Sequence, residues 1–285
     1  MCSQVREPQM NNRKLRIFSA PYIVWMALFT IIPLALIVVF AFTDRNTGGF
    51  TFDNIQFAAR YLPVLVKSVY LAAVATIICL VVSYPLAYIM SNMNLNRQRT
   101  MMMLVMLPMW MNFLLRTYAW MSILETNSGL LNKVVTFFGF EPVHVMYTQG
   151  AVILGMVYNY IPYMILPLYT IMLKIDRRLI EASQDLGCNT FQVFRKVVIP
   201  LSFPGITSGV TMTFVPAVST FVISQLLGGP KNNLIGDLIE SQFVSGGEYN
   251  PYYGSAISLL LMVVVFICMG IFNQFDNEEM EETLK

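Results

Sequence analysis

The chain has 285 residues, of which 56% are hydrophobic and 12% are charged, with a formal net charge of +2 and a mean hydropathy of +0.61. Soluble proteins carry about 25% charged residues, so this composition argues against a soluble domain. Several apolar runs of about 20 residues are long enough to cross a bilayer as helices. They lack the alternation of apolar and polar residues that transmembrane barrels require, so we predict an all-α membrane protein.

Six such runs follow one another along the chain. We predict six transmembrane helices over residues 17–42, 64–90, 101–124, 150–173, 205–227 and 253–275. The first run is too long for a signal peptide and lacks a small-residue cleavage site, so we expect it to remain in the protein. Residues 17–275 then form one membrane domain between an N-terminal tail (1–16) and an acidic C-terminal tail (276–285).

Lysines and arginines set the orientation, because cytoplasmic loops carry an excess of both residues. With the N-terminus in the cytoplasm, twelve of them fall on the inner side and four on the outer side. The inner residues are Arg6, Arg13, Lys14, Arg16, Arg97, Arg99, Lys174, Arg177, Arg178, Arg195, Lys196 and Lys285, and the outer ones are Arg45, Arg60, Lys133 and Lys231. We therefore expect both termini in the cytoplasm, together with the polar segment between the fourth and fifth predicted helices.

That polar segment, residues 174–203, is the elbow. It contains the run Glu181-Ala182-Ser183, then Gly187, and it closes with Pro200. The spacing predicts two short helices joined by a turn at Gly187, the second capped by Asn189 and ending at Pro200. An apolar stripe on the first helix comprises Leu179, Ala182, Ser183 and Leu186. A two-helix knob of this kind suits a groove on another protein, whereas the alternative is an ordinary cytoplasmic loop.

No motif for catalysis or nucleotide binding accompanies the elbow. The sequence has no glycine-rich phosphate-binding loop, so nucleotide energy would have to come from a partner. The four cysteines and the single histidine, His144, show no metal-ligand or catalytic spacing. A secondary transporter or channel would be expected to carry membrane-embedded acids, and an intramembrane enzyme a nucleophile with its base. Neither is found in the six predicted helices.

Five segments carry a family resemblance. They are Ser83-Tyr84-Pro85-Leu86-Ala87-Tyr88, Leu107-Pro108-Met109-Trp110-Met111-Asn112, Pro167-Leu168-Tyr169, the elbow, and Leu227-Gly228-Gly229-Pro230-Lys231-Asn232-Asn233-Leu234-Ile235-Gly236. With them the chain resembles the permease subunits of bacterial spermidine/putrescine ABC importers, and the elbow resembles the ATPase-coupling loop of ABC importer permeases. The Gly-Gly-Pro segment is the one more particular to polyamine importers. Ser183 and Ile199 depart from the usual alanine and leucine, and both changes leave the two helices feasible.

The resemblance implies a type I ABC importer permease fold in the bacterial cytoplasmic (inner) membrane. It implies four kinds of partner: a homologous second permease, two ATPase subunits, an extracytoplasmic polyamine-binding protein and the lipid bilayer, with no nucleic acid. The ATPase would bind ATP and magnesium, so no cofactor is expected in this chain. Coupling to the ATPase is expected at Glu181, Ala182, Ser183, Gly187 and Pro200.

A polyamine is a flexible polycation, which proteins bind with aromatic faces and carboxylates. Candidate pathway residues are Trp110, Tyr118, Trp120, Tyr160, Asp237 and Glu240. Trp110 follows Pro108, where a helix break can open the chain toward a pathway. The two acids share one face of a short amphipathic helix, 234–243, expected to be an outer gate, a binding-protein contact or an interfacial helix. Packing or anchoring at the membrane interface is the alternative for each aromatic residue.

The charged residues inside the predicted helices do not favour a polycation. No aspartate or glutamate falls within the six helices, whereas Lys67 and Arg116 do. Lys67 lies near the outer end of its helix and can extend to the interface. Arg116 lies deeper, where a charge needs a partner. Arg116 leaves an anionic substrate open, and the alternatives within this class of importer are other small solutes such as phosphonates or ferric iron.

Overall fold

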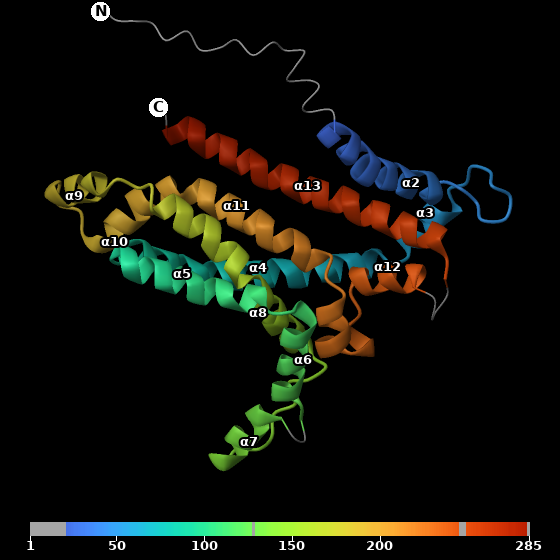
Figure 1. The fold of residues 1–285 in the computed structure, drawn as a ribbon, viewed down its shortest axis with the longest axis horizontal. Helices are drawn as coiled ribbons and strands as arrows, with labels where there is room; N and C mark the ends of the chain where they lie inside the picture. The colour runs from blue at the N-terminus through green and yellow to red at the C-terminus, as the bar shows by residue number, and fades with distance from the viewer. Residues whose placement is uncertain (1–20, 127–128, 245–248, 284–285) are drawn as a thin grey trace, which may run out of the picture.

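The computed structural model describes residues 21–126, 129–244 and 249–283, and Figure 1 shows them as a set of helices. Within these residues the single β pairing is an isolated bridge between Thr43 and Phe50. The all-α prediction is therefore confirmed. The predicted N-terminal tail, residues 17–20 of the first predicted helix and residues 284–285 of the acidic tail lie outside the described residues.

Four of the predicted membrane helices are found where the apolar runs place them. The first covers Pro21–Ala41 and consists of α-helical residues 21–26, a π-helical turn, η1 (Ala27–Ile31), and then α2 (Ile32–Ala41). The others are α4 (Leu62–Ser91), α8 (Gln149–Met172) and α13 (Pro251–Thr283). Each is long and apolar enough to cross a membrane. The short helices α3 (Asp53–Ala59), α7 (Leu130–Phe137) and α12 (Ile235–Phe243) lie between them.

The third predicted helix, 101–124, is broken close to Pro108, where the sequence suggested a break. It consists of α5 (Leu95–Trp110) and α6 (Phe113–Leu124), which are bent by 90° at the break. Met111 and Asn112 have extended backbone angles, and Asn112 Oδ1 accepts a hydrogen bond from the Leu114 N–H at 2.8 Å. Asn112 is therefore the N-cap of a new helix that starts in a different direction. Pro108 indicates a break near this point, but the apolar run does not reveal the 90° change of direction.

The fifth predicted helix, 205–227, is displaced along the chain. The observed helical segment is Thr190–Val218, made of α10 (Thr190–Val193), the π-helical turn η2 (Phe194–Val198) and α11 (Ile199–Val218). The prolines at 200 and 204 lie inside this segment and do not precede it. After Val218 the chain leaves the helix and forms two short turns, η3 (Ser224–Gly228) and η4 (Pro230–Asn232).

The core of the bundle is formed by α4, α8 and α11, with α13 packed on α11. Two glycines four residues apart let α11 approach α8 closely. A Cβ at Gly209 would lie 2.7 Å from Met164 Sδ, and one at Gly205 would clash with Ile171. Small residues at this spacing are typical of tightly packed membrane helices, where side-chain contact replaces the hydrophobic driving force.

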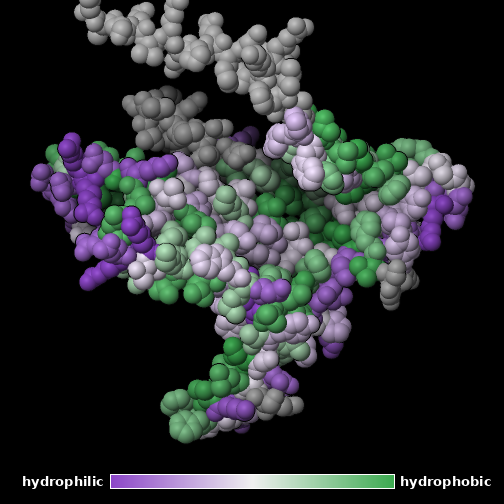
Figure 2. All heavy atoms as spheres, viewed as in Figure 1, coloured by the Kyte–Doolittle hydropathy of each residue, from purple (hydrophilic) through white to green (hydrophobic). Residues whose placement is uncertain are grey.

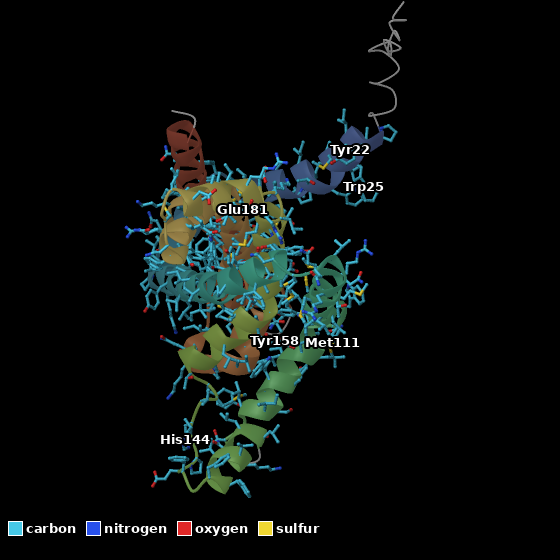
Figure 3. The ribbon with its side chains drawn as sticks, turned by 90° about the vertical axis from the view of Figure 1, so that its left-hand side faces the viewer. Tyr22, Trp25, Met111, His144, Tyr158 and Glu181 are labelled. Carbon is cyan, nitrogen blue, oxygen red and sulfur yellow. The ribbon has the colours of Figure 1, made fainter. Side chains whose placement is uncertain are left out.

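Two parts of the chain stand away from this core. The first membrane helix contacts α13, yet Ala41 at its end is its one buried residue, and Tyr22 and Trp25 lie free of the bundle (Figure 3). The α6–α7 arm projects from the bundle (Figure 1). Figure 2 shows hydrophobic residues along the arm and along the first helix, whereas hydrophilic residues gather at the end of the bundle that carries the elbow.

Candidate functional site

The first helix of the elbow, α9 (Arg177–Asp185), ends as the sequence predicts. Gly187 has a φ of +86°, a backbone angle that residues with a side chain rarely adopt. The Gly187 N–H donates to the Gln184 carbonyl at 2.9 Å, and the Cys188 N–H donates to the Ser183 carbonyl at 3.1 Å. These two bonds form a Schellman motif, so the predicted turn at Gly187 is confirmed.

The second helix of the elbow begins after Asn189, as predicted, but it does not end at Pro200. Asn189 Oδ1 accepts from the Gln192 N–H at 2.8 Å, and Gln192 Oε1 accepts from the Asn189 N–H at 2.9 Å, which is a capping box. The helix then continues through Pro200 into α11. The π-turn η2 widens the helix where the proline ring would otherwise clash with the carbonyl four residues before it. Pro200 therefore lies in the first turn of α11, inside the helical segment Thr190–Val218.

The elbow exposes charged and apolar side chains together. Glu181 and Ala182 are exposed, and Figure 3 shows Glu181 at the surface of the bundle. Ser183 is half-buried, and its hydroxyl donates to the Ile180 carbonyl at 2.7 Å. Three large apolar side chains are also exposed, namely Leu179 (49%), Leu186 (86%) and Phe191 (70%). Exposed apolar side chains with a polar rim are typical of a surface that docks on another protein.

Aromatic packing connects the elbow to α4. Phe194, in η2, makes edge-to-face contacts with Tyr84 and Tyr88, at ring-centroid distances of 5.4 and 5.5 Å. The Tyr84 hydroxyl shares a 2.6 Å hydrogen bond with Ser202 Oγ of α11, and both side chains are buried. Because packed interiors transmit displacement, a movement of the elbow is passed to α4 and α11 together.

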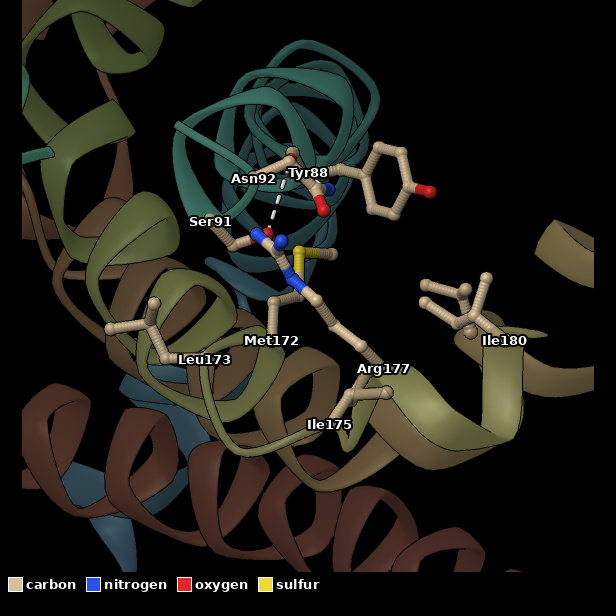
Figure 4. Close-up of a pocket in the computed structure, with 9 residues that line it drawn as sticks. Tyr88, Ser91, Asn92, Met172, Leu173, Ile175, Arg177 and Ile180 are labelled. Atoms are coloured by element: carbon tan, nitrogen blue, oxygen red, sulfur yellow. Dashed lines mark hydrogen bonds between the residues drawn. The ribbon is translucent and has the colours of Figure 1, made fainter. Parts of the chain in front are cut away.

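A small polar cavity separates the elbow from the ends of α4 and α8. Its volume is about 50 Å³, and it is lined by Tyr88, Ser91, Asn92, Met172, Leu173, Ile175, Arg177, Ile180 and Val198. Figure 4 shows Arg177 extending from α9 across this cavity toward Ser91 and Asn92 at the end of α4. A helix C-terminus carries partial negative charge, which favours a guanidinium there. Arg177 thus contributes to the packing of the elbow against the end of α4.

The aromatic residues predicted to line a pathway have different environments. Trp110, at the bend between α5 and α6, is 79% exposed, and Tyr118 is 50% exposed. Trp120 packs edge-to-face on Tyr158, with ring centroids 5.2 Å apart. Tyr160 is buried, and its hydroxyl donates to the Pro216 carbonyl at 3.3 Å. Trp120 and Tyr160 therefore take part in packing within this chain, whereas Trp110 and Tyr118 are open to a partner or to lipid.

The predicted short helix 234–243 is confirmed as α12, but its two acids are not equivalent. Asp237 is 5% exposed, and its Oδ2 accepts a hydrogen bond from the Leu234 N–H at 2.6 Å at the start of the helix. Glu240 is half-buried, and its Oε2 accepts from Gln225 Nε2 at 3.1 Å. In this structure the Asp237 carboxylate caps a helix, and the Glu240 carboxylate binds a neighbouring turn.

Burial raises the pKa of Asp237 to about 6, because the charged carboxylate is held away from water. The folded protein therefore binds this proton more tightly than the unfolded chain, and Asp237 costs stability progressively as the pH rises from about 4 to about 6. We expect Asp237→Asn to stabilise the protein above pH 6, by up to about 3 kcal/mol, and to have little effect below pH 4. Thermal unfolding in detergent across this range measures the effect. A difference between wild type and variant that does not change with pH would contradict it.

Sequence reasoning missed a junction between the Gly-Gly-Pro segment and two distant parts of the chain. The Nζ of Lys67 donates to Asn232 Oδ1 at 3.1 Å. Asn232 Nδ2 in turn donates to the Tyr147 carbonyl at 2.9 Å and to the Gly228 carbonyl at 3.1 Å. Tyr147, whose φ is +63°, also donates its N–H to the Leu227 carbonyl at 2.9 Å. The partners are far apart in sequence, so no local pattern indicated this junction.

Arg116 is 8% exposed on α6. Its Nε and Nη1 atoms are buried without a hydrogen-bond partner among the residues that the structure describes. The guanidinium lies 5.8 Å from the centroid of the Phe113 ring. The positive charge of Arg116 therefore contacts the aromatic face of Phe113, which lies one turn earlier on the same helix.

Comparison with known sequences places this geometry in context. A family model described as "Binding-protein-dependent transport system inner membrane component" matches residues 9–278. The spermidine/putrescine transport system permease protein PotB of Haemophilus influenzae is 36% identical over 284 residues, covering 95% of this chain and 98% of that protein. The protein of the same name from Escherichia coli is 34% identical over 257 residues, covering 87% of this chain and 92% of its own length.

Solved structures share the fold at low sequence identity. A bacterial ABC transporter involved in the import of the acidic polysaccharide alginate superposes with a TM-score of 0.79 at 15% identity, covering 94% of this chain and 96% of that one. The inward-facing MetNI methionine ABC transporter gives a TM-score of 0.59 at 18% identity, covering 76% and 95%. The overall arrangement of helices is therefore one that known ABC transporter subunits adopt.

Proposed function

The chain belongs to the binding-protein-dependent transport system inner membrane component family, and from this premise we propose that it is the permease subunit of a bacterial ABC importer for polyamines. The observation that carries the proposal is the elbow, whose two capped helices meet at Gly187 and expose both Glu181 and several large apolar side chains. The polyamine substrate is supported by the relatives named for spermidine/putrescine transport, which cover most of the chain.

The importer we propose contains a homologous second permease, two ATPase subunits and an extracytoplasmic polyamine-binding protein, all acting in the lipid bilayer. The family description specifies dependence on a binding protein. The first membrane helix and the α6–α7 arm have exposed apolar surfaces that one chain alone leaves uncovered, which suits a second permease or lipid. Both termini are proposed to lie in the cytoplasm, on the side of the elbow, because lysine and arginine concentrate there.

Energy enters through the elbow in this proposal. ATP and magnesium bind to the ATPase, and this chain acts without a cofactor or catalytic group of its own. Glu181, Ala182 and Ser183 form the docking face, and Gly187 sets the angle between its two helices. Pro200 lies where the elbow joins α11. Movement of the docked elbow reaches α4 through Phe194 and its two tyrosine neighbours, so the spans rock as the ATPase closes.

The substrate pathway is proposed to use Trp110 and Tyr118, which this chain leaves open, with Trp120 and Tyr160 supporting them from within the packing. Asp237 and Glu240 are proposed to contribute at the outer side. The alternative of an anionic substrate was based on Arg116. Since Arg116 Nε and Nη1 are sealed inside the chain, the guanidinium is not presented as an anion receptor here. The argument from Arg116 for an anionic substrate such as a phosphonate is thereby weakened.

Reconstitution tests this function directly. Proteoliposomes containing both permeases and the ATPase, supplied with the binding protein, are expected to accumulate radiolabelled spermidine and putrescine only when ATP is present. Phosphonate and ferric iron serve as competing substrates under the same conditions. Uptake of either of these without uptake of polyamines would assign the chain to a different importer.

A further inference from the structure

A second cavity lies away from the elbow, between the end of α6 and the residues that lead into α8. Its volume is about 270 Å³, and it is lined by Met121, Ser122, Glu125, Thr126, Met146 and Tyr147. Pockets for whole small molecules usually measure about 300–1,000 Å³, so this one suits a slender ligand or one end of a longer chain. In the orientation proposed above it opens on the outer side.

The lining has the chemistry of an alkylammonium site. Glu125 supplies an exposed carboxylate, and the Tyr147 ring is 57% exposed. A carboxylate accepts charge-assisted hydrogen bonds from a primary ammonium, and an aromatic face attracts the same cation. The thioethers of Met121 and Met146 can contact methylene groups beside the charge. No lysine or arginine lines the cavity to oppose a cation.

A divalent metal ion suits this cavity less well. Calcium and magnesium take about six or more oxygen ligands, usually including several carboxylates. Among the residues that the structure describes, the lining offers one carboxylate, with hydroxyl groups as its other side-chain oxygens. An organic cation needs fewer ligands and gains from the apolar part of the lining.

The position of Tyr147 is built by the rest of the fold. Among the residues that the structure describes, it is the non-glycine residue with a positive φ, at +63°. Such strain persists only where surrounding bonds hold it. The bond from its N–H to Leu227 and the bond to its carbonyl from Asn232 do so, and Lys67 fixes Asn232 in turn. The Gly-Gly-Pro segment thus acts on the cavity by positioning Tyr147.

We propose that Glu125 and Tyr147 form a subsite for a terminal ammonium group of the polyamine, occupied as the substrate passes from the binding protein into the permease. The carboxylate binds the ammonium, the ring covers one side of it, and the methionines contact the adjoining methylene chain. This subsite rests on the proposed polyamine function and adds to it a place of contact that none of the pathway residues above supplies.

The test measures equilibrium binding of radiolabelled spermidine to the purified complex of both permeases and the ATPase, without the binding protein. Glu125→Gln is expected to weaken binding by about tenfold or more, because it removes the negative charge while keeping the shape. Putrescine should lose a similar factor, since it also ends in a primary ammonium. Glu125→Asp should retain part of the affinity. Glu141→Gln is the matched control, because Glu141 is an exposed acid nearby in sequence that does not line the cavity.

The outcomes separate the subsite from the function. Equal spermidine affinity in wild type, Glu125→Gln and Glu141→Gln would overturn the subsite, even with normal polyamine uptake. A wild-type complex that takes up no polyamine with its binding protein would overturn the proposed function itself. Copurification with the ATPase checks assembly of each variant. Should Glu125→Gln fail to assemble, Tyr147→Leu decides instead, with Tyr147→Phe as its control, since only the former removes the ring.

Discussion

Replacing Gly187 by proline is expected to reduce ATP-driven uptake by about a hundredfold or more while the chain still inserts in the membrane. Proline fixes φ near −65°, whereas Gly187 has a φ of +86°. Proline also lacks the N–H that donates to the Gln184 carbonyl at 2.9 Å. Both bonds of the Schellman motif would be lost, and α9 would leave α10 at a different angle. Radiolabelled uptake in proteoliposomes and the amount of chain in the membrane fraction measure the two effects.

Gly187→Asn is the matched control for this change. Asparagine tolerates left-handed backbone angles better than other residues with a side chain, and it retains the N–H. A Cβ at this position meets no atom within 4 Å, so the side chain itself has room. We expect the asparagine variant to keep most of its uptake. Normal uptake by Gly187→Pro would show that the geometry of the elbow does not matter for coupling.

Reversing the charge of Glu181 is expected to separate the permease from its ATPase. Glu181 is exposed and lies on α9 between Leu179 and Leu186, which are also exposed. Placing the wrong charge in a docked interface costs about 3 kcal/mol or more, which is about a hundredfold in affinity. Glu181→Lys should therefore abolish copurification of the ATPase and ATP-driven uptake together. The helix itself should persist, since lysine is a good helix former.

Glu141→Lys provides the control for this reversal, because Glu141 is an equally exposed acid outside the elbow. It makes the same change of two charge units away from the proposed docking face, and it should leave ATPase binding unaltered. Equal loss of ATPase binding in both variants would indicate a general effect of charge. Retention of the ATPase by Glu181→Lys would place the docking contact elsewhere in the chain.

The membrane helices could be predicted from sequence because their signal is cumulative. A run of about 20 apolar residues leaves few alternatives to a spanning helix, and four of the six predicted helices follow their runs closely. The two failures come from single residues that act against such a run. Asn112 starts a new helix within the third run through one hydrogen bond from Leu114. Hydropathy averaged over a window of residues does not detect a single N-cap residue such as Asn112.

The elbow was predictable where its chemistry is local. Gly187 and Asn189 act on neighbours within five residues, and both act as expected. Pro200 misled because proline usually ends a helix, and the compensating π-turn involves residues that carry no distinctive sequence pattern. The junction of Lys67, Tyr147 and Asn232 was beyond reach for another reason. Each of these hydrogen bonds depends on how α4, α8 and the Gly-Gly-Pro segment pack together. A single sequence does not reveal that packing.

The uninterrupted helix Thr190–Val218 makes the length of this segment as important as its composition. An α-helix turns by about 100° per residue, so one residue inserted or deleted between Asn189 and the core of α11 would rotate the elbow by roughly that angle. Every cap and every docking side chain would survive, yet the docking face would point elsewhere. The π-turn η2 is itself equivalent to one residue inserted into a regular α-helix. The number of residues in this helix therefore sets the orientation in which the elbow meets its partner.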